Sequence, residues 1–156
     1  MTIKIALYKG TQAGIAGLYN RAVRAWTLGP YSHCALIAEE HANGDVTIWH
    51  ASWADGGVRQ KTIRLDPAKW DVIEVDGNLA RAVAWFEAHA GEGYDILGNF
   101  GFILRPIADD RDKWFCSEAI LEAMGQREAW RFDPNSLAAI VVDPVGFDTQ
   151  QCQRSR

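Results

Sequence analysis

The first half of the chain alternates between apolar and polar residues over short stretches, a pattern typical of half-buried β-strands. Turn-forming residues separate these stretches, and Asn43-Gly44 between two of them predicts a tight hairpin. Because successive short strands are joined by short connections, the pattern favours an antiparallel sheet. We expect strands over residues 3–8, 31–38, 46–52, 58–65 and 70–75.

Apolar residues recur every three or four positions in other parts of the chain, which predicts helices. The stretch from Thr11 to Trp26 has its apolar residues on one face with Arg21 and Arg24 beside it, and we interpret both arginines as part of a solvated surface. Further helices are expected over residues 79–90, 116–124 and 134–139, a short helix and a loop over 94–104, and an edge strand over 140–142. Together these elements predict an α+β fold.

Length and composition indicate one globular domain, because 156 residues with 48% hydrophobic and 23% charged residues can bury a core. We expect this domain over residues 1–149 and a mobile tail over 150–156. The net charge of −4 argues against a nucleic-acid partner, and no apolar run is long enough to span a membrane. The N-terminus lacks the layout of a signal peptide, and the three cysteines form no C-x-x-C pair, so we expect a cytoplasmic protein as synthesised.

Cys116 is the first candidate for chemistry. It follows a polar loop and begins the stretch with helical spacing, so it should lie in the first turn of a helix. Unpaired backbone N–H groups and the positive end of the helix dipole favour a thiolate there, and a thiolate is the nucleophilic form. Free cysteines are also common packing residues in cores, and the local pattern leaves both interpretations open.

Two histidines lie on the strands that flank the predicted hairpin. His33 is near the start of one strand and His50 is on the return strand, although the register decides which faces they occupy. A strand histidine facing a helix N-terminal cysteine can take the thiol proton, and a further polar group can hold the imidazole in the right tautomer. The alternatives are structural histidines, or a zinc site of His33, His50 and Cys116. The lack of C-x-x-C or H-x-x-x-H spacing argues against zinc, so no metal or cofactor is expected.

The order of four short motifs resembles a known family. Tyr31-Ser32-His33, a strand containing His50, Gly93-Tyr94-Asp95-x-x-Gly98 and Phe115-Cys116-Ser117-Glu118 look like the circularly permuted branch of the NlpC-like, papain-fold cysteine hydrolases. In that branch the histidine strand precedes the cysteine helix. The opening strand and the turn over residues 55–59 also resemble small bacteriophage-encoded members. The resemblance covers residues 3–144 and implies a papain-like antiparallel sheet packed against the nucleophile-bearing helix.

This resemblance implies a role for each matched residue. Cys116 matches the nucleophile and His33 the general base. His50 stands where the family places its third polar residue, which is often an acid. Tyr94, Tyr31 and Ser32 are expected at the oxyanion and substrate-binding positions, and the backbone N–H of Cys116 would supply one oxyanion donor.

The implied activity is that of a cysteine peptidase or amidase, which hydrolyses an amide through a thioester on Cys116. The similarity to phage-encoded members favours cell-wall peptides of peptidoglycan as substrate, and delivery of the protein to the cell envelope. A lipid acyl hydrolase or acyltransferase with the same triad is one alternative, and a non-enzymatic binding module is another. The lipid reaction would need a wide apolar groove, for which the candidates are Trp26, Trp49, Trp53 and Phe102.

Overall fold

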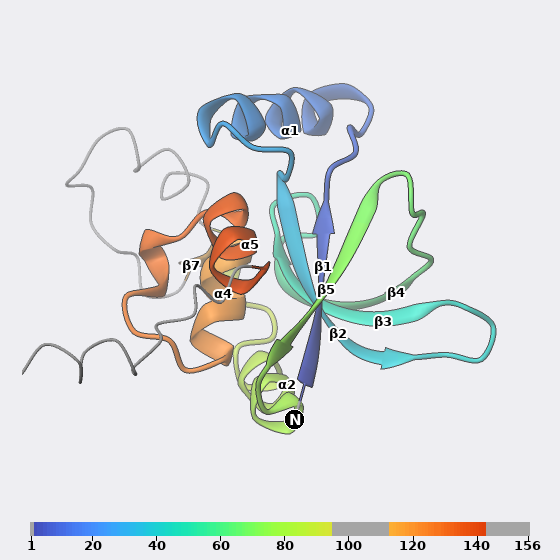
Figure 1. Ribbon diagram of the computed structural model, residues 1–156, viewed down its shortest axis with the longest axis vertical. Helices are drawn as coiled ribbons and strands as arrows, with labels where there is room; N and C mark the ends of the chain where they lie inside the picture. The colour runs from blue at the N-terminus through green and yellow to red at the C-terminus, as the bar shows by residue number, and fades with distance from the viewer. Residues whose placement is uncertain (1, 95–112, 143–156) are drawn as a thin grey trace, which may run out of the picture.

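The fold is seen in a computed structural model that describes residues 2–94 and 113–142 of the chain. Within these ranges five strands form one antiparallel sheet in the order β4-β3-β2-β1-β5 (Figure 1). The α+β class and the antiparallel sheet expected from the sequence are therefore confirmed. The strands are β1 (Thr2–Tyr8), β2 (His33–Glu40), β3 (Val46–Ser52), β4 (Gly57–Ile63) and β5 (Trp70–Asp76).

The β2–β3 hairpin contains a β-bulge. Near the turn, Glu39 pairs with Thr47, whereas further along Ile37 pairs with Ile48, so the register shifts by one residue between Ile37 and Glu39. The turn itself is closed by Gly44, whose φ of +85° suits a residue without a side chain. The bulge changes which residues of β3 lie beside the start of β2.

The main core lies between the sheet and helices α2 (Leu79–Ala88) and α4 (Cys116–Ala123), which both lie on one side of the sheet in Figure 1. Asn78 caps α2 by accepting the N–H of Arg81 at 3.1 Å. Trp49 of β3 stacks on Phe86 of α2 with ring centroids 5.9 Å apart. Each fully buried large side chain of this kind stabilises the fold by roughly 1.5–3 kcal/mol.

The opposite face of the sheet carries a smaller apolar cluster. By strand alternation His33 and Ala35 point to this face, whereas Cys34 between them points to the main core. The buried members of the smaller cluster, and the half-buried residues packed on them, are Ala6, Ala35, Ile37, Val46, Ile48, Ile63, Leu65 and Trp70. The sheet thus presents two apolar faces, and the start of β2 borders both.

Two segments at the C-terminal side differ from the sequence-based expectation. Residues 140–142 belong to helix α5 (Pro134–Val142) and form no edge strand. Asp133 accounts for this, because its carboxylate accepts the N–H groups of Asn135 and Ser136 and so starts a helix that continues through the apolar residues. Tyr94, the first residue of the expected short helix and loop over 94–104, belongs to β6 (Gly93–Tyr94), which pairs in parallel with β7 (Lys113–Trp114). The rest of that expected helix and loop, and the expected tail over 150–156, lie outside the described residues.

Helix α1 (Gly14–Trp26) lies across the ends of β1 and β2, apart from the other helices (Figure 1). Its N-cap is Ala13, two residues after Thr11, which the sequence predicts as the N-cap. Only Gly17 and Asn20 of α1 are buried. The short helix η1 (Ala129–Arg131) connects α4 to α5.

The first residue of β4 generates a stability prediction. At Gly57, φ is +120° and an added Cβ would lie 1.9 Å from the carbonyl oxygen of Glu92, whereas Gly56, with φ of +76°, has open space around it. We expect Gly57→Ala to lower the free energy of unfolding by more than about 2 kcal/mol and Gly56→Ala by about 1 kcal/mol, since only the first adds a backbone clash to the strain. Urea unfolding measures both, and equal losses would contradict the close approach.

Candidate active site

Cys116 is the first residue of α4, as the sequence predicts. Phe115 before it is extended, with φ of −99° and ψ of 164°, and its N–H donates to Glu118 Oε2 at 3.4 Å. Ser117 Oγ donates to the carbonyl oxygen of Phe132 at 2.6 Å, which holds the first turn from the other side. The Cys116 sulfur therefore sits at a fixed helix N-terminus, where the dipole favours negative charge.

Cys116 is only 3% exposed and lies in the main core beside Cys34 of β2. A hydrogen bond with the Cys34 side chain is the largest cause that holds the pKa of Cys116 well below its usual value. Burial opposes this shift, whereas the charge of His33, a hydrogen bond with its imidazole and a hydrogen bond with the Cys34 backbone add to it. Burial, followed by the contact with Cys116, raises the pKa of Cys34 well above its usual value. These opposite directions favour Cys116 as the thiolate and Cys34 as its protonated donor.

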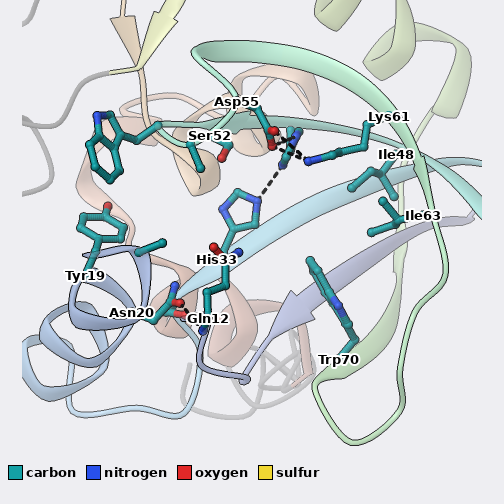
Figure 2. Close-up of a pocket in the computed structure, with 15 residues that line it drawn as sticks. Gln12, Tyr19, Asn20, His33, Ile48, Ser52, Asp55, Lys61, Ile63 and Trp70 are labelled. Atoms are coloured by element: carbon teal, nitrogen blue, oxygen red, sulfur yellow. Dashed lines mark hydrogen bonds and ion pairs between the residues drawn. The ribbon is translucent and has the colours of Figure 1, made fainter. Parts of the chain in front are cut away.

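His33 and His50 are joined directly. His33 Nε2 lies 2.9 Å from His50 Nδ1, and the two rings meet edge to face with centroids 5.1 Å apart (Figure 2). His50 is buried on β3, whereas His33 at the start of β2 is half-buried. The structure thus brings together the three residues that the sequence singled out, with His33 between Cys116 and His50.

The line of contacts continues to Asp55, a residue that the sequence analysis assigned only to a turn. Asp55 Oδ2 lies 3.2 Å from His50 Nε2, but the approach lies outside hydrogen-bond alignment, so the contact is electrostatic. Lys61 Nζ donates to both carboxylate oxygens of Asp55, at 2.7 and 2.8 Å. The sign of this contact in the sequence is that Asp55 follows the strand histidine His50 by five residues, in the tight turn that leads to the next strand.

Burial determines the protonation of His50. It is the largest cause that lowers the pKa of His50 to about 3, and the neighbouring His33 adds to the shift while Asp55 opposes it. Burial also acts to raise the pKa of Asp55, but the hydrogen bond from Lys61 and the nearby imidazoles bring it below its usual value. Near pH 7 the line therefore contains a neutral His50 and a charged Asp55.

These protonation states assign the tautomers of both rings. A carboxylate only accepts hydrogen bonds, so Asp55 favours the proton on His50 Nε2 and leaves His50 Nδ1 as an acceptor. His33 Nε2 then donates to His50 Nδ1, which leaves His33 Nδ1 for the proton of the Cys116 thiol. The arrangement can move a proton from sulfur to imidazole and hold the resulting imidazolium in place.

A pocket of about 280 Å³ opens on the histidine side of this line (Figure 2). His33 and His50 line it from the sheet, and Tyr19 and Asn20 line it from α1. Ser32 lines it too; it is 2% exposed, and its Oγ has no hydrogen-bond partner within residues 2–94 and 113–142. Because a buried hydroxyl without a partner costs free energy, Ser32 is available to bond a ligand in this pocket.

The two predicted tyrosines are placed differently. Tyr31 donates through its hydroxyl to Asp71 at 3.0 Å and through its N–H to Asn135 at 2.9 Å, so it anchors the segment that leads to His33. Burial, followed by the Asp71 contact, raises the pKa of Tyr31. Tyr94 pairs through its backbone with Trp114, two residues before Cys116, and its side chain lies outside the described part of the chain.

The aromatic groove considered for lipid chemistry is not assembled by the described tryptophans. Trp49 is buried in the main core, whereas Trp26 is exposed on α1. Trp53 does line the pocket, and Phe102 lies outside the described residues.

In the described ranges, no group of three or more His, Cys, Asp or Glu side chains is arranged to hold a metal ion. No helix within the same ranges has the length and apolar character needed to cross a membrane. Compared with known proteins, the sequence matches no protein-family model and no curated protein.

The contact between the two thiols predicts the reactivity of Cys116. We expect iodoacetamide to alkylate Cys116 near pH 6, where an unperturbed thiol is less than about 1% ionised, and to leave Cys34 unmodified. Cys34→Ala removes the main cause of the lowered pKa, so the midpoint of the alkylation rate against pH should move upward. Peptide mass mapping at a series of pH values measures this. Cys34→Ser keeps a donor and is the matched control; an inert Cys116 or an unmoved midpoint in Cys34→Ala would contradict the assignment.

The pKa of His50 predicts a pH dependence of stability. The folded protein keeps His50 neutral down to about pH 3, whereas an unfolded histidine takes up a proton near pH 6.5. Between these values the unfolded state binds more protons, so this stabilisation is complete above pH 6.5 and is lost as the pH falls toward 3. We expect the free energy of unfolding to drop by on the order of a few kcal/mol across this window, measured by urea unfolding. His50→Gln should flatten the drop, and an equally steep profile for that variant would assign it to other groups.

Proposed function

We propose that the protein is a thiol-dependent acyl hydrolase that cleaves an amide bond through a thioester on Cys116, with the papain-like fold of the permuted NlpC-like branch. The observation that carries this proposal is the line of contacts from Cys34 through Cys116, His33 and His50 to Asp55. A thiolate paired with an oriented imidazole is the arrangement that thiol hydrolysis needs. Packing alone does not account for it, because a core cysteine requires none of these polar partners.

The reaction proceeds in two halves. The Cys116 thiolate attacks the substrate carbonyl carbon, and the electron pair of the C=O bond moves to oxygen. The backbone N–H of Cys116 is one donor to this oxyanion, and the unpartnered Ser32 hydroxyl supplies a second contact. Protonated His33 donates to the leaving amine as the C–N bond breaks. Water, deprotonated by the now neutral His33, then attacks the thioester and releases the acid and the thiolate.

His50 and Asp55 act as positioning residues in this mechanism. Neutral His50 accepts from His33 Nε2 and so leaves Nδ1 for the thiol, the role that an acid often has in the resembled family. Asp55 holds the His50 tautomer through its negative charge, and Lys61 keeps that carboxylate ionised. In this chain the acid Asp55 therefore acts on His50, which in turn orients the base His33.

We propose a peptide amide as the substrate, of the class found in bacterial cell walls. The pocket of about 280 Å³ is slightly smaller than the roughly 300–1,000 Å³ typical of ligand sites, and both polar and apolar side chains line it. Gln12, Asn20, Ser32 and Ser52 can bond peptide N–H and C=O groups. The resemblance to phage-encoded hydrolases supports the same class. A lipid ester is the second candidate, favoured by Trp53, which lines the same pocket and is 43% exposed.

Turnover of purified muropeptides and of a phospholipid ester, followed by mass spectrometry, tests both substrate classes. Cys116→Ala should abolish turnover with the thermal midpoint unchanged, and His33→Ala should lower kcat nearly as far. His50→Ala should lower kcat by about 10- to 1,000-fold, because an orienting group is partly replaceable. Asp55→Asn is the matched isosteric change, and it should lower kcat with little effect on KM.

Each outcome selects among the candidates. Full turnover by a folded Cys116→Ala variant would rule out the nucleophile. A loss in His50→Ala equal to that in Cys116→Ala, with normal activity in His33→Ala, would reverse the assignment of the base. Hydrolysis of the phospholipid alone would select the lipid reaction. No turnover together with an inert Cys116 thiol would favour the non-enzymatic binding module.

A further inference from the structure

Helix α1 turns its apolar side to solvent. Ile15, Leu18 and Trp26 are 74%, 68% and 53% exposed, and Leu28 just beyond the helix is 92% exposed. Ala22, also exposed, falls on the same face as the first three because they are spaced by three to four residues. These five residues form the apolar stripe of α1. A surface helix ordinarily turns such a stripe to the core, so α1 is oriented the opposite way.

Polar contacts fix this orientation from the inner side of α1. Arg24 Nη1 donates to the carbonyl oxygens of Lys9 and Gly10 at 2.6 and 2.7 Å. Gly17 packs so closely that an added Cβ would lie 2.0 Å from the carbonyl oxygen of Gln12. A rotation of α1 that buried the apolar stripe would break these contacts, so the exposure of the stripe is built into the fold.

The backbone conformation at Leu28 also indicates that the apolar stripe has a partner. Its φ of +51° is left-handed, a conformation that glycine adopts without strain after a helix and that leucine rarely does. A strained position is thus occupied by a large apolar side chain that almost no part of the described chain covers. Packing within residues 2–94 and 113–142 does not explain a leucine there, whereas a contact outside them does.

The charges around α1 select an anionic partner. The chain has a net charge of −4, yet α1 contains no Asp or Glu and two arginines, Arg21 and Arg24. Arg21 is exposed beside the apolar stripe and makes no hydrogen bond or ion pair with any residue that the structure describes. An apolar face with Trp and Leu, flanked by basic and not acidic residues, is the pattern of helices that lie in a membrane interface.

A second copy of the chain fits this face less well. A helix of 13 residues is about 20 Å long, so one stripe offers roughly a few hundred Å². Stable interfaces bury about 800 Å² per partner. A two-fold contact along the stripe would also bring the unpaired Arg21 of each copy toward the other.

We propose that α1 docks the protein onto the surface of an anionic phospholipid bilayer, with the apolar stripe at the boundary of headgroups and acyl chains and Arg21 among the headgroups. Ala16, Tyr19 and Asn20 line the pocket from the inner side of the same helix, so docking brings the pocket close to the bilayer (Figure 2). The inference goes beyond the proposed hydrolase function and does not depend on it, because binding requires no chemistry at Cys116.

Flotation of the purified full chain with vesicles tests this directly. We expect binding to vesicles of phosphatidylcholine with phosphatidylglycerol, weakened about fivefold when the anionic lipid is left out, as for one arginine near the surface. Ile15→Ser with Leu18→Ser should weaken binding by at least about tenfold, since two apolar side chains leave the interface. Leu28→Gly should weaken binding while keeping or raising the thermal midpoint, which separates docking from folding. Val72→Ser and Ile140→Ser change exposed apolar residues on other elements and are the matched controls.

The proposal is overturned if the wild-type chain does not float, or if the Val72 and Ile140 controls lose as much binding as the stripe variants. It is also overturned if light scattering shows a stable dimer that Ile15→Ser with Leu18→Ser dissociates, because the stripe would then be an interface between copies. Loss of binding in the stripe variants alone, with a monomeric wild type, supports it. Hydrolytic activity enters none of these readouts.

Discussion

The bulge in β2 decides which face of the sheet the two histidines share. Beyond the bulge Leu36 pairs with Trp49, and extending that register by one residue places His50 opposite Ala35. Ala35 is two residues from His33, so both imidazoles point to the same face and lie diagonally across neighbouring strands. The 2.9 Å contact between the rings, and with it the tautomers that leave His33 Nδ1 for the Cys116 thiol, depend on this offset.

If the register beside the turn continued along the whole hairpin, His50 would lie opposite Leu36 and turn into the main core with Cys34. Alternation along β2 separates Cys34 from His33, and the bulge places His50 on the same face as His33. Cys34 points to the core, where its thiol meets Cys116, and His33 points to the pocket side, where His50 orients it. Because both residues are at the start of β2, the thiolate receives one partner from each face of the sheet. Either partner alone would have to offset the burial that opposes the charged thiolate.

Local patterns predicted the elements of this site better than their relative placement. Alternation and turn residues predicted the strands, and helical spacing after a polar loop predicted that α4 begins at Cys116. Strand register could not be predicted, because the sequence carries no visible sign of the bulge after Ile37. The role of Asp55 was missed for a related reason: Asp-Gly-Gly is a turn signal whether or not the acid also contacts His50. Tertiary packing alone brings the two thiols together.

The orientation of α1 sets two surfaces at once: the polar wall of the pocket and the exposed apolar stripe. Helical spacing shows that a helix has an apolar face, but not whether that face meets the core or solvent. In this protein the pocket determines which side of α1 faces inward. The pocket needs polar groups on its wall, and Asn20 with its neighbours supplies them from the inner side of α1. Once the polar side faces inward and Arg24 holds it there, the apolar side has no position except the outside. The exposed stripe is thus the geometric consequence of a polar pocket wall built from an amphipathic helix, and it places an apolar surface beside the pocket.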